Sequence, residues 1–181
     1  MPSYRIAAAR PADLSSLSAI ELAAARLLAG HAPESVLAET TSPMALAKAQ
    51  HDGHLWVVLA DDAPVGFAHV ETIERDAVHL EEIDVAPQHG RRGLGTMLVL
   101  HVCRWAVVNG YASMTLTTFR EVPWNMPFYA RLGFDVVPTD ELSAPLRAVV
   151  EDEHRRGLDP SQRVVMRRWF SWRRTFPGTS G

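Results

Sequence analysis

Cysteine is nearly absent from this sequence, since Cys103 is the only one among 181 residues. One cysteine cannot form an intrachain disulfide, whereas small secreted domains usually depend on several. The scarcity excludes a disulfide-stabilised secreted domain and favours a reducing, cytoplasmic compartment. Cys103 lies in a stretch of helical periodicity with Val99 and Ala106 on its face, so we interpret it as a small buried side chain and not as a nucleophile.

Long apolar runs and an excess of positive charge are also missing. Residues 1–10 contain no apolar stretch of the length that a signal peptide or a membrane span needs, so we expect a mature start and no membrane contact. The formal net charge of −3 and the pI near 6.2 disfavour a nucleic-acid binder. No histidine or cysteine cluster has the spacing of a metal site, so we expect no metal. After these exclusions we expect the ligand to be a small molecule. The sequence is compatible with either a monomer or a homodimer.

The length and the 47% apolar composition suit a single domain with a full core. We expect this domain to cover residues 1–170 and residues 171–181 to form a loose tail. The run at 167–174 mixes arginines with aromatic residues, as surfaces for single-stranded nucleic acid do, but the acidic balance favours a final strand and a solvated tail. Strand and helix patterns together predict a mixed α/β fold with one sheet. The predicted strands are 4–9, 54–60, 65–70, 77–85, 113–118, 134–137 and 163–169, and the predicted helices are 11–30, 94–109, 127–132 and 141–156, with one or two short helices in 31–53.

The predicted strand 77–85 contains an irregularity. Val78 and Leu80 are even-numbered while Ile83 and Val85 are odd-numbered. Because side chains alternate between the two faces of a strand, a regular strand cannot bury all four on one face. One extra residue near Glu81 and Glu82 would restore the phase, which defines a β-bulge. The alternative is a strand buried on both faces, and two adjacent glutamates make that alternative less favourable.

A glycine-rich turn follows this strand and opens a helix. Gly90, Gly93 and Gly95 have no Cβ and can adopt backbone angles that other residues avoid, so backbone N–H groups can converge on one anion. The first turn of the helix adds unpaired N–H groups and the positive end of its dipole. Arg91 and Arg92 add full charges. The turn therefore predicts a phosphate site.

Two segments together resemble the GNAT superfamily of acetyl-CoA-dependent N-acetyltransferases. The first runs from Ile83 through Gly95, and the second is Trp124-Asn125-Met126-Pro127-Phe128-Tyr129-Ala130-Arg131-Leu132-Gly133-Phe134. The chain lacks the Gly-Lys-Ser/Thr of a P-loop and the spaced glycines of a Rossmann turn. The resemblance implies a mixed, mostly antiparallel twisted sheet of about six to seven strands, with a bulged and splayed central strand and flanking helices.

The resemblance also implies which residues hold the coenzyme. The backbone of the splayed strand would pair with the pantetheine arm, the glycine turn would hold the pyrophosphate, and the Asn125 side chain would contact the arm. Asn125 could equally serve as the N-cap of the helix that follows it. Gly90 departs from the family pattern, which commonly has Gln or Arg there, so pyrophosphate binding should depend on backbone N–H groups and the two arginines. The implied coenzyme-binding residues are Ile83, Asp84, Val85, Gly90, Arg91, Arg92, Gly93, Leu94, Gly95, Thr96 and Asn125.

Acetyl transfer to an amine needs a base and a proton donor for the leaving thiolate. The family often keeps a base at the bulge, where Glu82 is favoured slightly over Glu81, and His79 is a further candidate that we interpret as structural. Because strand alternation should send the two glutamates to opposite faces, we expect only one to act as the base. Tyr129 stands where the resemblance places the general acid, and its alternative role is aromatic packing beside Phe128.

The sequence thus predicts an enzyme that transfers the acetyl group of acetyl-CoA to a primary amine by direct attack in a ternary complex. Acidic residues near the bulge favour a small cationic amine as the acceptor. Residues 27–50 and 118–124 should shape its pocket. The alternatives are a peptide or protein N-acetyltransferase and a non-catalytic module that binds acetyl-CoA.

Overall fold

Seven strands form one sheet in the computed structural model, which describes residues 2–170. The predicted loose tail at 171–181 lies outside the described residues. The strand order is β1-β2-β3-β4-β5-β7-β6, and every neighbouring pair is antiparallel except β4 and β5, which run parallel. This confirms the predicted mixed, mostly antiparallel sheet. The strands are β1 (Tyr4–Ala8), β2 (Leu55–Ala60), β3 (Ala63–Glu74), β4 (Ala77–Val85), β5 (Ser113–Phe119), β6 (Asp135–Val136) and β7 (Arg163–Trp169).

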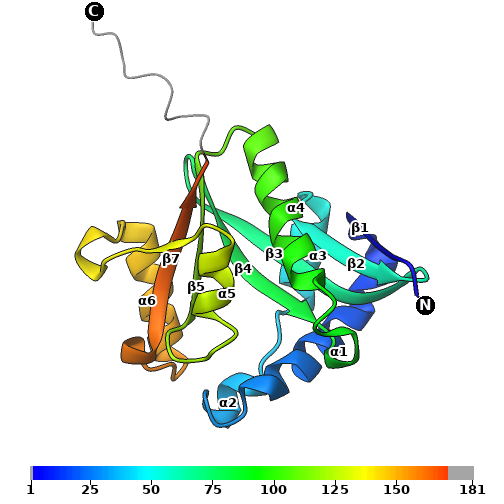
Figure 1. Ribbon diagram of the computed structural model, residues 1–181, viewed down its shortest axis with the longest axis horizontal. Coiled ribbons are helices and arrows are strands. Elements are labelled where there is room, and N and C mark those ends of the chain that lie inside the picture. The colour runs from blue at the N-terminus through cyan, green and yellow to red at the C-terminus, as the bar shows by residue number, and fades with distance from the viewer. Residues whose placement is uncertain (1, 171–181) are drawn as a thin grey trace, which may run out of the picture.

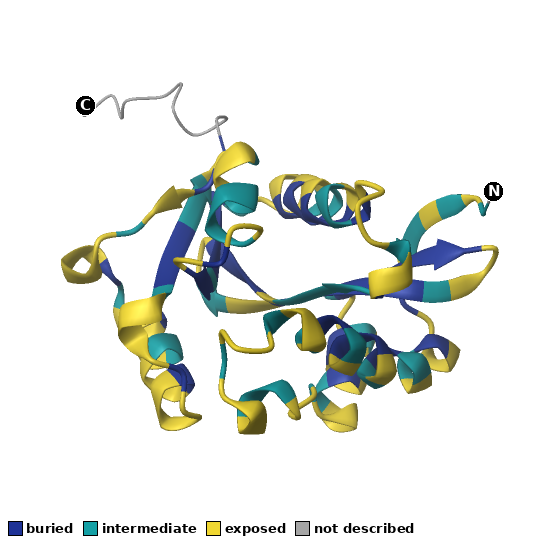
Figure 2. Cartoon of the chain, turned by 60° about the horizontal axis from the view of Figure 1, so that its bottom comes forward, coloured by how far each residue is buried: buried dark blue, intermediate teal, exposed yellow. Residues whose placement is uncertain are grey.

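Helices cover both faces of the sheet (Figures 1 and 2). On one face α4 and α5 pack over a large apolar cluster that includes Val78, Leu80 and Phe134. On the other face α1 and α3 cover the β1–β3 half of the sheet and α6 covers the β7 half. The helices are α1 (Leu14–Ala25), α2 (Glu34–Leu37), α3 (Pro43–His51), α4 (Leu94–Val108), α5 (Met126–Arg131) and α6 (Ala144–Arg155).

Most element boundaries agree with the sequence patterns, and the differences have local causes. The hairpin turn is only Asp61 and Asp62, both with positive φ, so β3 begins at Ala63 and continues to Glu74, beyond the predicted 65–70. The predicted helix 141–156 begins at Ala144, because the Ser143 hydroxyl accepts a hydrogen bond from the N–H of Leu146 and fixes the helix start there.

The bulge predicted in β4 is present. Leu80 pairs with Val70 and Glu82 pairs with the adjacent His69, so Glu81 is the extra residue. Because of this insertion, Ile83 and Val85 pack against the same apolar cluster as Val78 and Leu80. The bulge therefore keeps the apolar residues of β4 on the α4 face over its whole length.

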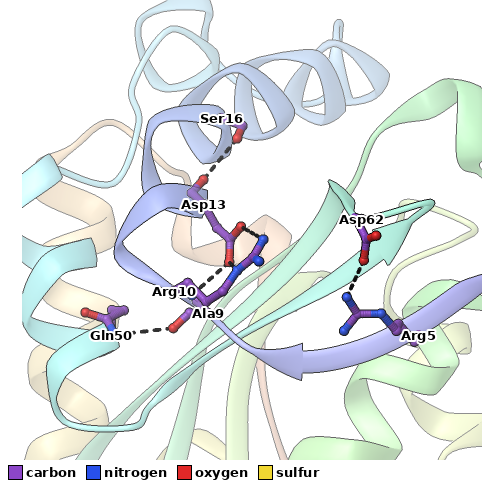
Figure 3. A network of polar contacts seen from close by, with 7 residues as sticks. All are labelled: Arg5, Ala9, Arg10, Asp13, Ser16, Gln50 and Asp62. Carbon is purple, nitrogen blue, oxygen red and sulfur yellow. Dashed lines mark hydrogen bonds and ion pairs between the residues drawn. The ribbon is translucent and has the colours of Figure 1, made fainter.

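A polar network fixes the start of α1 against the sheet (Figure 3). The buried Asp13 carboxylate accepts hydrogen bonds from the Arg10 backbone N–H at 2.8 Å and from the Arg10 guanidinium at 2.7 and 3.1 Å. The Ser16 hydroxyl donates to the Asp13 carbonyl at 3.0 Å, and Gln50 of α3 donates to the Ala9 carbonyl at 3.3 Å. The bonds of Asp13 close the turn that leads into α1, and the Gln50 bond ties α3 to the residue after β1.

Gly66 of β3 is the position at which a side chain would most directly disturb β4. A Cβ on Gly66 would lie 2.6 Å from the Asp84 carbonyl oxygen and 2.9 Å from a Val58 methyl group. We expect Gly66→Ala to lower the free energy of unfolding by about 1–3 kcal/mol, because β3 and β4 must separate to accommodate it. Urea unfolding followed by circular dichroism measures this change.

Gly95→Ala is the matched control. Its Cβ would meet only Phe128, at an ordinary contact distance of 3.6 Å, within helix α4. Since alanine favours a helix over glycine by up to about 1 kcal/mol, this variant should be at least as stable as the parent. A Gly66→Ala protein that unfolds at the parent's urea concentration would contradict the close packing described here.

Candidate active site

β4 and β5 pair at only one end and then diverge (Figure 1). The parallel ladder joins Ala77–Leu80 to Ser113–Leu116 and stops there, while β4 continues along β3 to Val85. The edge of β4 that faces β5 beyond Leu80 therefore has no strand partner among residues 2–170. The Ile83 N–H, for example, makes only a 3.3 Å contact with the neighbouring Glu82 carboxylate. Such an edge can pair with an extended ligand.

A cavity of about 890 Å³ occupies the gap between the diverging strands. Leu80, Ile83 and Val85 line it from the α4 side, whereas His79, Glu82 and Asp84 lie on the other face of β4. The cavity thus connects the two faces of the sheet. Helix α5 contributes Tyr129, and the residue before the helix contributes Asn125.

The glycine turn leads from β4 into α4 with two residues in left-handed conformation. These are Arg91, with φ of 55°, and Gly93, with φ of 78°. Gly90 and Gly95 do not use the left-handed conformation that is open to glycine, since Gly90 has φ of −62° and Gly95 lies inside α4. At Gly90 a Cβ would lie 3.0 Å from the Pro87 carbonyl oxygen, which is a tight contact.

The end of this turn offers the donors that an anion needs. The N–H groups of Leu94, Gly95 and Thr96 begin α4 and precede the first intrahelical bond, from the Met97 N–H to the Gly93 carbonyl. Arg91 and Arg92 are exposed and form no ion pair within the described part of the chain. Backbone donors, a helix N-terminus and two unpaired guanidinium groups therefore fit a pyrophosphate.

Asn125 and Tyr129 reach the cavity from α5. Asn125 occupies the N-cap position, but its side chain makes no capping bond, and only its carbonyl accepts from the N–H of Phe128 and Tyr129. Its amide is therefore available to a ligand. The Tyr129 ring packs edge-on against Phe128 and Phe134, at centroid distances of 4.9 and 5.9 Å. Burial raises the pKa of the Tyr129 phenol, and the nearby Glu82 and Asp84 raise it further, so the hydroxyl stays protonated.

Three carboxylates of β4 line the cavity together. The surrounding protein withdraws Glu82 from water, which raises the pKa of Glu82 to about 7, and Glu21 adds to the shift. The same withdrawal raises the pKa of the cavity-facing Glu81 to about 7, with Glu71 as the next cause. Burial and the hydrogen-bonded Glu82 raise the pKa of Asp84 well above its usual range.

Glu81 and Glu82 both line the cavity, which reaches both faces of the sheet. The opposite orientation that strand alternation predicts for them therefore keeps neither carboxylate away from a ligand, and the bulge interrupts that alternation at Glu81. Each of the two carboxylates is therefore within reach of a ligand in the cavity, and each has a pKa suited to proton exchange near neutral pH.

His79 and Cys103 are both buried, and burial shifts the pKa of each toward its neutral form. His79 is fully buried and shares a hydrogen bond of 2.9 Å with the Thr115 hydroxyl, and burial lowers the pKa of its imidazole to about 4. Burial raises the pKa of the Cys103 thiol to about 11, although Arg168 opposes the shift, so the thiolate is disfavoured.

Sequence reasoning missed several residues of the cavity. Glu21 lies in the buried stripe of α1 with Leu17 and Ala24, and its carboxylate accepts from the Thr41 N–H at 2.9 and 3.0 Å. A glutamate within an apolar stripe is the signal that could have revealed it. No local signal pointed to Glu71 of β3 or to α6, both of which line the cavity.

The two segments that we expected to shape the acceptor pocket, 27–50 and 118–124, each contribute some of the residues that line the cavity. From 27–50, the residues Leu27, Leu28, Ala32, Val36, Leu37 and Glu39 line the cavity, and from 118–124, Thr118, Phe119 and Trp124 do. The Trp124 ring also meets His31 edge-on at 6.0 Å. Within residues 2–170, no helix combines the length and apolar character needed to cross a membrane, and no three or more His, Cys, Asp or Glu residues are grouped to hold a metal ion.

Known structures share this fold. The PaiA N-acetyltransferase from Thermoplasma acidophilum, in complex with coenzyme A, superposes with a TM-score of 0.73 at 18% identity, over 93% of this chain and 99% of that chain. The ribosomal-protein-S18-alanine N-acetyltransferase from Escherichia coli gives a TM-score of 0.67 at 19% identity, over 99% of both chains. The N-acetylglutamate synthase from Neisseria gonorrhoeae, complexed with coenzyme A and N-acetyl-glutamate, gives 0.69 at 18% identity over 92% of this chain and 35% of that chain.

The sequence itself also matches a family model, described as the Acetyltransferase (GNAT) family, over residues 24–134. This match covers more than half of the chain and includes the bulged strand, the glycine turn and the segment from Asn125 to Phe134. It ends at Phe134, where the second motif ends. The chain therefore belongs to the GNAT family of acetyl-CoA-dependent N-acetyltransferases.

Proposed function

We propose that this enzyme acetylates a primary amine of a small cationic molecule, by direct attack on acetyl-CoA in a ternary complex. The observation that carries this proposal is the charge of the cavity, which eight carboxylates and three arginines line. Each arginine forms an ion pair with one of these carboxylates: Arg155 with Asp152, Arg156 with Glu39, and Arg163 with Glu153. The five others have no arginine or lysine partner in residues 2–170 and are Glu21, Glu71, Glu81, Glu82 and Asp84.

The donor side of the site is assigned to the unpaired edge of β4 and the start of α4. The backbone of Ile83 to Val85 would pair with the pantetheine arm, and the Asn125 amide would contact it. The N–H groups from Gly93 to Thr96, with Arg91 and Arg92, would hold the pyrophosphate. Acetyl-CoA, when bound, supplies a thioester carbonyl that the amine can attack.

Glu82 is assigned as the base. An amine with a pKa near 10.4 is almost entirely protonated at pH 7, and removing its proton there costs about 4.6 kcal/mol. A carboxylate with a pKa of about 7 is well matched to take that proton near neutral pH. Glu82 is favoured over Glu81 because the charge of Glu82 acts on Tyr129, the residue assigned as the proton donor.

Tyr129 is assigned as the donor to the leaving sulfur. As the new C–N bond forms and the C–S bond breaks, the phenol donates to the departing thiolate. The ammonium nitrogen begins with three protons and keeps one: Glu82 accepts the first, and the second replaces the proton that Tyr129 gives up. Because the charge of Glu82 helps to raise the pKa of Tyr129, protonation of Glu82 makes the phenol a better donor as the thiolate leaves.

The decisive test of the proposed function is an amine panel with acetyl-CoA, followed by release of the free thiol. The panel includes monoamines, diamines and a peptide with a free amino terminus. Turnover of small amines supports the proposal. Turnover of the peptide alone would assign the chain to peptide acetylation, and tight binding of acetyl-CoA without turnover of any amine would indicate a binding module.

The base assignment predicts a pH profile. With the best amine of the panel, kcat/KM should rise about tenfold per pH unit below pH 7 and level off above it, because Glu82 must lose its proton. In Glu82→Gln the rate should fall about 10²–10⁴-fold and the break near pH 7 should disappear. Glu81→Gln makes the same charge change one residue away and should keep the break. If Glu81→Gln removes the break and Glu82→Gln keeps it, Glu81 is the base.

The donor assignment predicts the behaviour of Tyr129→Phe. This change removes the hydroxyl and keeps the ring that packs on Phe128 and Phe134. We expect kcat to fall about 10²-fold or more and KM for acetyl-CoA to change little, because the lost bond acts on the leaving sulfur. Phe128→Leu serves as the packing control. A Tyr129→Phe enzyme with the parent's kcat would refute the role.

The pyrophosphate assignment predicts weaker coenzyme binding when both charges of the turn are removed. We expect Arg91→Ala with Arg92→Ala to raise the Kd for coenzyme A about tenfold at low salt, and the difference should shrink in 1 M salt. Calorimetry measures both values. Arg75→Ala, an exposed arginine between β3 and β4, should bind like the parent. Unchanged affinity in the double variant would remove the turn from the binding site.

A further inference from the structure

We propose that the acceptor is a linear diamine or a longer oligoamine, and that Glu71 and Glu81 hold its second ammonium group while the first reacts beside Glu82. This inference rests on the proposed function and narrows the acceptor from any cationic amine to one with two separated charges. It is carried by the arrangement of carboxylates within the cavity.

Glu71 and Glu81 lie on adjacent strands and line the same cavity. Glu71 of β3 pairs with His79 of β4, and Glu81 is two residues beyond His79. Glu81 is the residue inserted at the bulge, immediately after Leu80, which pairs with the Val70 that precedes Glu71. The charge of Glu71 acts on Glu81 and contributes to its raised pKa. One ammonium group between them could donate to both, since it carries three N–H bonds.

Neither carboxylate has a cationic partner among the described residues. The polar neighbour of Glu71 is His69, whose Nε2 lies 3.8 Å away. Burial lowers the pKa of His69, so its ring is neutral at pH 7 and adds no positive charge beside Glu71. Lys48 of α3, whose pKa the charge of Glu71 helps to raise, forms its ion pair with Asp52. Glu81 forms no hydrogen bond or ion pair within residues 2–170. By contrast, Glu39 and Glu153 of the same cavity are each paired with an arginine.

A second group of carboxylates lies at the reaction centre. Glu71 pairs with His79, which precedes the bulge, whereas Glu82 and Asp84 follow it. Glu82 and Asp84 act on the pKa of Tyr129, and Glu71 and Glu153 act on that of Glu81. The cavity therefore holds two regions of negative charge, one beside the proton donor and one toward β3 and α6. Apolar residues complete the second region, because Ile73, Ala148 and Val149 also line the cavity. Two anionic regions with apolar walls match two ammonium groups joined by methylenes.

Paired acceptors of equal chain length test this inference. kcat/KM is measured with acetyl-CoA for 1,4-diaminobutane, butylamine and 4-amino-1-butanol, and again for 1,6-diaminohexane and hexylamine. We expect the better diamine to exceed its monoamine by about tenfold or more, and the amino alcohol to behave like butylamine. Glu71→Gln should lower the diamine-to-monoamine ratio at least severalfold.

Glu151→Gln is the matched control, because Glu151 is an exposed glutamate of α6 that does not line the cavity. It should leave the ratio unchanged. Equal rates for both diamines and their monoamines, or an unchanged ratio in Glu71→Gln, would overturn the inference while turnover of monoamines still supports the proposed function. If no amine is acetylated, the proposed function fails. Calorimetry then measures how tightly 1,4-diaminobutane binds to the complex of the protein with coenzyme A. Weaker binding in Glu71→Gln than in the parent supports the second ammonium site. No binding, or equal binding in both proteins, overturns it.

Discussion

The site depends on one constraint, which is that β4 has a different partner along each half of its length. At its start β4 pairs with both β3 and β5, and beyond Leu80 it keeps only β3. Backbone groups that would otherwise complete a ladder are left for a ligand, and the gap becomes a cavity that joins the two faces of the sheet. The bulge at Glu81 lies at this transition. It keeps the apolar residues of β4 packed beneath α4 while it brings an additional carboxylate to the cavity.

The concentration of carboxylates is the second consequence of this arrangement. The charge of Glu21 of α1 helps to raise the pKa of Glu82 and Asp84 of β4, and the charge of Glu71 of β3 helps to raise the pKa of Glu81. Together with burial, this repulsion disfavours the ionised forms of the three β4 carboxylates in the free protein. A cationic acceptor would relieve this repulsion, so the same charges that carry a cost in the free enzyme would favour binding. The ion pairs of Glu39 and Glu153 show how the fold compensates carboxylates at other points of the cavity wall.

Several structural features far from the reaction centre hold this geometry in place. The Arg10–Asp13 network fixes the start of α1, and Thr41 binds the Glu21 carboxylate, so the helix presents that residue at a defined position. Gly66 allows β3 to approach β4 closely at the level of Asp84. At the other wall, Glu153 and Arg163 link α6 to β7. The Arg10–Asp13 contact is local, whereas each of the others joins different elements and therefore depends on the complete fold.

Local patterns in the sequence were enough to predict the family, the order of most elements and the bulge. The parity change between Leu80 and Ile83 located the inserted residue, because alternation along a strand is a local property. The glycine turn and the segment from Asn125 to Phe134 are also local patterns, and their resemblance to the GNAT family indicated coenzyme A. Only the tertiary structure decided that Glu81 and Glu82 share one cavity and that Gly93 and Arg91, not Gly90, adopt the left-handed conformation. It alone brought Glu21 and Glu71 to the site, because cavity walls and carboxylate pKa values arise from contacts between residues distant in the chain.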